Sequence, residues 1–356
     1  MGQRERDIWV GVPPRKIFWP DRAIFGNICR RTATLGRKGK AINQLTVTRE
    51  DVLAARDRIT GLVERTPLIE TEIGGANVWL KAECLQTGGA FKLRGATNRL
   101  LQLSSEERAR GVVAFSSGNH ARGVAIAAKR LGIRAVIVMP SDAPKVKVEG
   151  TAAEGAEIVF YDRLRESREE IAERLAGETG ATVVPSFDDP AIVAGQGTVG
   201  LEIVEQFGAP PERILTPCGG GGLASGIALA VPEAAIVVAE PQGWDDMARS
   251  LDQGAIMPVQ PNPPPTICDA IQTLRVCELT LGILRGRNAQ AVAVSDADVE
   301  AAIRFAWDKH RLVVEPGGVA ALAALLAGKC APSEGTVVVV SGGNIDPALH
   351  ARIVGA

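Results

Sequence analysis

The chain has 356 residues, of which 46% are hydrophobic and 23% charged, and its formal net charge is −1. That length and composition are those of a globular protein with a large buried core, which excludes a disordered or fibrous chain. A nearly neutral chain has no global field to attract nucleic acid or an acidic membrane surface, so we expect small-molecule chemistry. No apolar run in the sequence reaches the roughly 18 residues that a membrane-spanning helix needs.

The six cysteines are scattered without a C-x-x-C pair, which argues against a zinc site or a disulfide framework and fits a reducing cytoplasm. Residues 1–44 differ from the rest, because they contain ten Lys or Arg and three acidic residues, a local net charge of +7. We expect a disordered N-terminal extension there. Two alternatives remain: a transit peptide, which the acidic residues and Pro13-Pro14 disfavour, and a true start near Leu45 or Val47.

Regular structure is predicted to begin at Thr48, because a capping-box pattern precedes apolar residues at helical spacing. Short runs rich in β-branched residues then predict strands at 112–115, 134–139, 157–161, 214–216, 236–239 and 336–340. Helical patterns lie between them, one beginning near Asn119 and another after a capping box at Ser295. Strands that alternate with helices, and that are continuously apolar, predict an α/β protein with parallel sheets.

The first motif with chemical content surrounds Lys92, which follows Phe91 within a run of small residues, 88–96. Small residues allow the backbone and a bound molecule to approach closely. Burial lowers the pKa of a lysine and so supplies the neutral amine that imine formation with an aldehyde requires. A surface lysine at the start of a helix remains the alternative at this point.

The second motif lies between a buried strand and a helix, and it consists of Ser116, Ser117, Gly118, Asn119 and His120. Backbone N–H groups at a helix N-terminus, joined by Ser and Asn side chains, form a site for a carboxylate. The alternative is ordinary N-capping by Ser or Asn, which stabilises a helix by about 1 kcal/mol and needs no ligand.

The third motif is a glycine-rich loop between a strand and a helical run, and it consists of Gly219, Gly220, Gly221, Gly222 and Leu223. Successive glycines let backbone amides converge on an anion at a helix N-terminus. The Rossmann spacing is weakly matched and the P-loop lysine is missing, so we expect a phosphate ester rather than a nucleotide. A fourth motif begins at Ser341, after the strand at 336–340, where the ligand crevice of an open α/β sheet usually lies. An ordinary turn is the alternative there.

In this chain order, the four motifs resemble those of the serine/threonine dehydratase family of fold-type II pyridoxal-phosphate enzymes. The resemblance extends from about Leu45 to Ala356 and includes Phe-Asp-Asp-Pro at 187–190, Gly-Gln-Gly-Thr at 195–198 and Glu-Pro-Gly-Gly at 315–318. It implies a fold like that of tryptophan synthase β, with two three-layer α/β lobes and the cofactor between them. A large cofactor-binding domain would comprise 45–110 and 189–356, and a small substrate-binding domain 111–188.

The resemblance also implies roles for these residues. Lys92 would form the Schiff base with the cofactor and Phe91 would flank its ring. Asn119 would bond the phenolic oxygen, the loop from Gly219 to Leu223 would hold the phosphate, and Ser341 would face the pyridine nitrogen. The turn from Ser116 to His120 would bind the substrate carboxylate. Ala90 stands where the family often has serine, which removes a hydroxyl beside the cofactor.

A further stretch resembles the cation site of metal-dependent members of the family. Its candidates are the carboxylates of Glu240 and Asp246 and the carbonyl of Trp244, hard oxygen ligands suited to Mg²⁺ or Ca²⁺. Family members usually have a small residue at Trp244, and two solvated acids are the alternative.

The resemblance implies an ammonia-lyase that converts L-threonine to 2-oxobutanoate and L-serine to pyruvate, with Lys92 as general base at Cα. Two alternatives share the scaffold: an amino-acid racemase with Ser117 as second base, and a 3-hydroxyaspartate ammonia-lyase, which would need another cation in the pocket. A nucleotide-dependent oxidoreductase would leave Lys92 without a role. We expect a cytoplasmic homodimer that binds no nucleic acid or membrane. Only 15 residues follow Ser341, so we expect no regulatory domain and no feedback by isoleucine.

Overall fold

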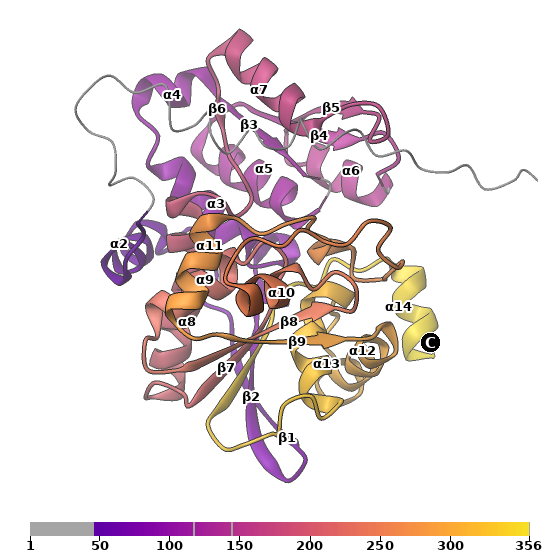
Figure 1. Cartoon of the computed structure of the whole chain (residues 1–356). Coiled ribbons are helices and arrows are strands. Elements are labelled where there is room, and N and C mark those ends of the chain that lie inside the picture. Colours follow the sequence, from indigo (N-terminus) through magenta and orange to yellow (C-terminus); the bar gives the residue numbers. More distant parts are fainter. Residues whose placement is uncertain (1–45, 117, 144, 356) are drawn as a thin grey trace, which may run out of the picture. The chain divides into compact units, whose positions relative to one another are not determined.

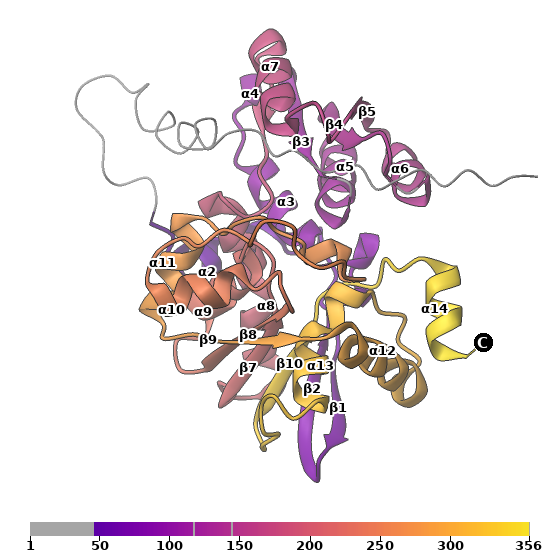
Figure 2. The same ribbon diagram turned by 45° about the vertical axis from the view of Figure 1, so that its right-hand side comes forward.

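The computed structural model describes residues 46–116, 118–143 and 145–355 of the chain. The expected extension, residues 1–44, lies outside them, and so does Ser117. The described part contains two β-sheets, and helices lie against both of them (Figure 1; Figure 2). None of its helices is both long and apolar enough to cross a membrane.

The larger sheet has six strands in the order β1-β2-β10-β7-β8-β9. Their bounds are β1 (Leu68–Ile73), β2 (Ala76–Ala82), β7 (Arg213–Pro217), β8 (Ala235–Pro241), β9 (Gln290–Val294) and β10 (Thr336–Val340). β1 and β2 form an antiparallel pair, and every other neighbouring pair is parallel. The strands predicted at 214–216, 236–239 and 336–340 are confirmed, whereas the sequence patterns do not predict β1, β2 or β9.

The smaller sheet has four parallel strands in the order β5-β4-β3-β6. Their bounds are β3 (Val112–Phe115), β4 (Ala135–Pro140), β5 (Glu157–Tyr161) and β6 (Thr182–Val183). The first three are the predicted strands, and β6 is a two-residue strand that no pattern indicates. The smaller sheet is parallel, and the larger one is parallel except for the β1–β2 pair, which confirms the predicted α/β class.

Helices fill the connections between strands. The α-helices are α2 (Arg49–Ile59), α3 (Lys92–Leu101), α4 (Ser105–Arg110), α5 (Asn119–Leu131), α6 (Lys145–Ala152), α7 (Arg168–Thr179), α8 (Pro190–Phe207), α9 (Gly222–Ala230), α10 (Asp246–Gln253), α11 (Glu278–Gly286), α12 (Asp296–His310), α13 (Ala320–Leu326) and α14 (Pro347–Val354). The 3₁₀ segments are η1 (Glu83–Leu85), η2 (Thr87–Gly89), η3 (Asp269–Ile271) and η4 (Pro316–Val319). Both predicted capping boxes form, at Thr48 before α2 and at Ser295 before α12.

Apolar side chains fill both faces of the larger sheet. Along β10, Val337 and Val339 join the cluster formed with α8 and α9, whereas Val338 and Val340 join the cluster formed with α12 and α13. A strand that is buried on both faces needs an uninterrupted apolar sequence, and the five residues of β10 satisfy this. The core therefore fixes the end of β10, from which Ser341 follows.

Helix α3, which begins at Lys92, contacts both α5 and α8. Its Leu93 and Leu100 belong to the core cluster that also holds Val112 and Ala114 of β3. α3 therefore packs between α8, which covers the larger sheet, and the core of the smaller sheet. The division of the chain into a large and a small domain stays a prediction.

A buried ionic network fixes the first turn of α3. The guanidinium of Arg94 pairs with Glu83 (Nε–Oε2 2.8 Å) and with Glu202 of α8 (Nη1–Oε1 2.6 Å). Lys81 of β2 pairs with the second oxygen of Glu202 at 2.6 Å. The side chains of Lys81, Glu83 and Arg94 are fully buried. Because buried charges are tolerated only when they are paired, β2, α3 and α8 are held in one arrangement.

Candidate active site

Lys92 is the first residue of α3, and its amine is buried. Its Nζ donates a hydrogen bond to the carbonyl of Ser186 (2.9 Å) and lies 5.2 Å from the centroid of the Phe91 ring. Burial lowers the pKa of Lys92 to about 8, so a substantial fraction of the amine is neutral near physiological pH. A neutral amine is the form that attacks an aldehyde, which fits the predicted role better than a surface lysine does.

In the turn before α5, no described side chain caps the helix. The N-cap residue is Gly118, which has no side chain, and Asn119 is the first residue of the helix. Ser116 Oγ accepts a hydrogen bond from the Gly118 N–H (3.2 Å) instead of reaching the helix. Neither Ser116 nor Asn119 caps this helix among the described residues, so its N-terminus is available to another anion.

The amide of Asn119 joins a buried polar group that the sequence motifs do not assign. Its Nδ2 donates to Glu315 Oε1 (2.5 Å), and its Oδ1 accepts from Asn344 Nδ2 (2.7 Å). Glu315 is only 2% exposed, and burial raises the pKa of its carboxyl to about 7, against the opposing effect of the Asn119 hydrogen bond. Both partners lie in stretches that the sequence singled out, at 315–318 and 341–344, but no role was predicted for either.

The glycine-rich loop connects β7 to α9 in the manner of an anion-binding turn. Gly221 has φ +85°, a conformation that side chains rarely adopt, and it precedes α9 without a side-chain cap. The ring of Phe187 packs so closely on Gly220 that a side chain there would overlap it. Helix N–H groups next to a run of glycines are suited to bind an anion, and the phosphate-binding role of this loop stays a prediction.

Ser341 lies directly beside the loop that carries Lys92. The Ser341 carbonyl accepts a hydrogen bond from the Phe91 N–H (3.2 Å), and Gly342 forms a bridge with Ala90. Since β10 neighbours β7 in a parallel pair, Ser341 and the glycine-rich loop follow strands at the same edge of the sheet. The structure thus brings together the Lys92, Asn119 and Ser341 motifs, and the Ser186-Phe187 segment joins Lys92 to the glycine-rich loop.

Two buried carboxylates lie close together: Glu240 is the penultimate residue of β8, and Asp246 is the first residue of α10. Glu240 accepts hydrogen bonds from the N–H groups of Met247 (3.0 Å) and Ala248 (2.8 Å) at the start of α10. Asp246 is fully buried, and neither of its oxygens has a hydrogen-bond partner among the described residues. Burial raises the pKa of Asp246 to about 7, and burial together with Asp246 raises the pKa of Glu240. A hard divalent cation would relieve both effects.

The large side chain at Trp244 does not stand in the way of such a cation. Its indole Nε1 donates to the carbonyl of Pro264 (2.8 Å), which lies in a loop rich in proline at residues 258–265. No group of three or more His, Cys, Asp or Glu side chains in the described ranges is arranged for a metal. A site here would therefore depend on the two carboxylates and on backbone carbonyl oxygen. These residues fit the cation that the family resemblance implies.

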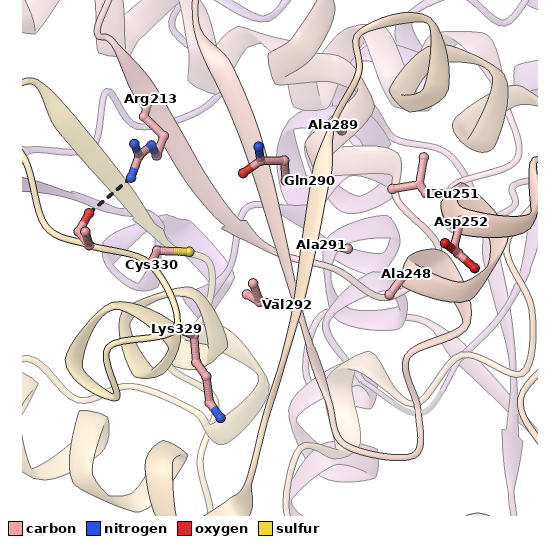
Figure 3. A pocket seen from close by; sticks show the side chains of 11 residues that line it. Arg213, Ala248, Leu251, Asp252, Ala289, Gln290, Ala291, Val292, Lys329 and Cys330 are labelled. Atoms are coloured by element: carbon pink, nitrogen blue, oxygen red, sulfur yellow. Dashed lines mark hydrogen bonds between the residues drawn. The ribbon is translucent and has the colours of Figure 1, made fainter.

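A separate hollow of about 700 Å³ lies beside β9 (Figure 3). Its walls include Arg213, Asp252, Lys329 and Cys330. Burial raises the pKa of the Cys330 thiol above its ordinary value. None of the predicted site residues lines the hollow. The hollow is therefore distinct from the site around Lys92.

Known proteins are similar to this chain in sequence and in fold. The pyridoxal-phosphate dependent enzyme family matches residues 59–342. An L-threo-3-hydroxyaspartate ammonia-lyase of Pseudomonas sp. is 41% identical over 313 residues, which are 85% of this chain and 97% of the relative. An L-threonine ammonia-lyase of Thermotoga maritima is 38% identical over 316 residues, 86% of this chain and 78% of the relative. The structure of maize serine racemase has a TM-score of 0.81 at 36% identity and covers 86% of this chain and 96% of that one.

A buried amine among turns suited to anions is what an enzyme that holds a phosphorylated aldehyde requires. The chain belongs to the pyridoxal-phosphate dependent enzyme family and has the fold-type II architecture. Pyridoxal phosphate is therefore its cofactor. Its relatives are ammonia-lyases and racemases for amino acids.

Proposed function

We propose that the protein is an ammonia-lyase for β-hydroxy amino acids, with L-threonine and L-serine as substrates. The observation that carries the proposal is Lys92, whose buried amine has a pKa near 8 and adjoins the Asn119 and Ser341 motifs. In this proposal, threonine gives 2-oxobutanoate and ammonia, and serine gives pyruvate and ammonia.

Each residue has a role that its position supports. Pyridoxal phosphate supplies an electron sink for charge that develops at the substrate Cα. Lys92 Nζ would hold the cofactor covalently, and the Lys92 amine would also act as the base that takes the proton from the substrate Cα. The loop from Gly219 to Leu223 binds the phosphate, Asn119 bonds the phenolic oxygen, and Phe91 flanks the ring. The turn at residues 116–120 orients the substrate carboxylate.

Ser341 sets the electronic character of the site. It is 4% exposed and follows β10, and it would meet the pyridine nitrogen with a neutral hydroxyl. A hydroxyl does not hold a proton on that nitrogen as a carboxylate would, so the ring is a weaker electron sink. A weaker electron sink would favour loss of the β-hydroxyl over transamination.

A second candidate substrate is L-threo-3-hydroxyaspartate, the substrate named for the relative that is 41% identical. Helix α7 begins at Arg168 after β5, and Phe115 ends β3 in the same parallel sheet. The Arg168 guanidinium lies 5.5 Å from the centroid of the Phe115 ring, and Phe115 directly precedes the turn at residues 116–120. Arg168 is the cation that we propose for a second substrate carboxylate.

The metal and the assembly complete the proposal. Glu240, Asp246 and the Trp244 carbonyl would bind Mg²⁺ or Ca²⁺. Met247, whose N–H bonds Glu240, also packs against Gly221, so a cation there would support the glycine-rich loop from behind. We further propose a cytoplasmic homodimer in which residues 111–188 form the substrate-binding domain.

The decisive experiment is a panel of β-hydroxy amino acids assayed for oxo-acid and ammonia release. L-threonine, L-serine, both diastereomers of 3-hydroxyaspartate and D-serine should be included, with chiral analysis of the remaining substrate. Oxo-acid release from threonine and serine at equal or higher kcat/KM than from 3-hydroxyaspartate is expected. Interconversion of L- and D-serine faster than pyruvate release would replace the lyase with a racemase.

A further inference from the structure

We infer that Asn344 and Arg122 are positioning residues that determine which end of the Asn119 amide faces the cofactor. Three consecutive hydrogen bonds support this inference. Arg122 Nη1 donates to Asn344 Oδ1 (3.1 Å), and Asn344 Nδ2 donates to Asn119 Oδ1 (2.7 Å). Asn119 Nδ2 then donates to Glu315 Oε1 (2.5 Å). The inference rests on the proposed function, in which Asn119 bonds the phenolic oxygen.

The donors and acceptors give this series of three hydrogen bonds one direction. An amide side chain has an acceptor and a donor of nearly equal size, so its orientation depends on its partners. Arg122 has only donors and therefore requires the oxygen of Asn344. The nitrogen of Asn344 is left for Asn119 and requires its oxygen. The nitrogen of Asn119 is thereby turned away from Asn344, to the side on which Glu315 lies.

A further hydrogen bond fixes the nitrogen end of the Asn344 amide. Its Nδ2 also donates to the carbonyl of Gly88 (2.9 Å), which has only acceptor capacity. A side chain on the neighbouring Gly89 would overlap the Asn344 amide, so the space around it is closed. Because the amide is bonded at both ends in a closed space, it cannot rotate without losing hydrogen bonds to Arg122 and Gly88.

The direction matters because the phenolic oxygen of the cofactor carries negative charge when it is ionised. A donor facing that oxygen stabilises it, whereas an amide oxygen in the same place repels it. The Asn119 nitrogen has two hydrogens, so one can remain on Glu315 while the other meets the cofactor. Arg122 and Asn344 thus act on the cofactor through Asn119 without touching it.

The test reverses the direction with an isosteric change. In Asn344→Asp, the carboxylate keeps its bond to Arg122 but can only accept, so Asn119 must present its nitrogen to it and its oxygen to the cofactor. We expect pyridoxal phosphate to bind about 10- to 100-fold more weakly, the equivalent of one hydrogen bond to a charged group. Affinity is measured by titrating the apoprotein and following visible absorbance. Arg122→Lys keeps a donor, so its affinity for pyridoxal phosphate should stay within about threefold of the wild-type value. Arg122→Met keeps only the hydrogen bond from Asn344 to Gly88, so its affinity should lie between those of Arg122→Lys and Asn344→Asp.

A double-mutant cycle separates this role from a structural one. In an Asn119→Ala background, Asn344→Asp should cost less than about twofold in cofactor affinity, because its effect passes through Asn119. Equal losses with and without Asn119 would overturn the inference. If the aspartate variant fails to fold, Asn344→Ala takes its place, because it removes the amide without reversing it. The loss of cofactor affinity that it causes should also vanish in the Asn119→Ala background.

The failure of the inference and the failure of the proposed function give different results. Wild-type protein that binds no pyridoxal phosphate with visible absorbance would refute the role assigned to Lys92 and the inference with it. The inference alone would be refuted if Asn119→Ala binds pyridoxal phosphate weakly while Asn344→Asp binds it as tightly as the wild type.

Discussion

Lys92 and His120 donate hydrogen bonds to carbonyls two residues apart on one short segment of chain. Lys92 Nζ lies 2.9 Å from the Ser186 oxygen, and His120 Nε2 lies 2.9 Å from the Val184 oxygen. Burial lowers the pKa of His120 to about 3, with a smaller contribution from the charge of Lys92, so the ring is neutral and Nε2 carries the donated proton. His120 therefore fixes a segment that Lys92 also uses, and Phe187 follows on it to pack against the glycine-rich loop.

Replacing Lys92 by alanine should abolish both turnover and the visible absorbance of bound cofactor. The buried amine is the group that attaches the cofactor in the proposed mechanism, and alanine offers no nucleophile. Lys129→Ala, which removes a 57% exposed lysine of α5, is the matched control and should behave like wild type. Borohydride treatment of the wild type should label one lysine, Lys92, and wild-type ammonia release from Lys92→Ala would contradict the mechanism.

The capture of pyridoxal phosphate by the apoprotein should accelerate as pH rises through about 8. Burial lowers the Lys92 pKa from 10.5 to about 8, so the reactive neutral amine becomes the main form above that value. Between about 8 and 10.5 the folded protein binds fewer protons than the unfolded chain, so Lys92 makes the apoprotein more stable as pH increases across this window. Stopped-flow absorbance tests the rate. A midpoint near the ordinary lysine value would show that the amine is not desolvated.

Removing divalent cations should lower the melting temperature of the protein. Glu240 and Asp246 place two buried like charges together, and Asp246 has no other partner among the described residues. We expect chelation to destabilise the wild type and added Mg²⁺ or Ca²⁺ to restore it, as measured by calorimetry. Asp246→Asn should lose this response, while Asp252→Asn, on the exposed side of the same helix, should keep it. If chelator and cation leave the wild-type melting temperature unchanged, the carboxylates bind no metal.

Arg168 should determine how well the enzyme accepts a dicarboxylic substrate. Arg168→Met should reduce kcat/KM for L-threo-3-hydroxyaspartate by about 10-fold or more, because one charge-assisted hydrogen bond contributes roughly 1.5–3 kcal/mol. L-threonine turnover should change by less than about twofold, since threonine lacks the second carboxylate. Arg165→Met, with an 85% exposed side chain nearby, is the control. A parallel loss for both substrates would assign Arg168 a structural role.

Ser117→Ala should separate elimination from racemisation. Elimination needs a base on one face of Cα, which Lys92 supplies, whereas racemisation needs a proton donor on the other face. L-threonine deamination should persist with a loss equivalent to one neutral hydrogen bond, about 0.5–1.5 kcal/mol. Any interconversion of L- and D-serine should disappear, as chiral chromatography can measure, and Ser116→Ala should retain it. Racemisation that survives in Ser117→Ala would exclude this serine as the second base.

The sequence predicts the buried strands well and the others poorly, for a physical reason. β3 and β10 are largely buried runs dominated by apolar residues, and their bounds match the predicted ranges. β1 and β2 contain charged residues that a pattern treats as exposed. Lys81 in β2 is in fact fully buried, and its charge is compensated by Glu202, which lies 121 residues further along the chain. Such compensation cannot be read from a local pattern.

The same limit applies to the site. Lys92, the glycine-rich loop and Ser341 could be recognised because each motif has its own local signature of small residues and strand ends. The partners of Asn119 could not, because Glu315 and Asn344 lie 196 and 225 residues away in the sequence. The carboxylate pair of Glu240 and Asp246 is an intermediate case, since the two residues are close in sequence but their burial depends on the packing of α10.

The ionic network beneath α3 has a consequence for how this protein can change by mutation. Within the network of Lys81, Glu83, Arg94 and Glu202, loss of Arg94 would leave Glu83 charged and fully buried, at a cost of about 3–5 kcal/mol. That is a large part of the 5–15 kcal/mol by which a typical protein is stable. Laboratory evolution for a new substrate should therefore leave these positions unchanged and accumulate substitutions in the loops above them. A successful replacement of the network should require several simultaneous changes to apolar residues.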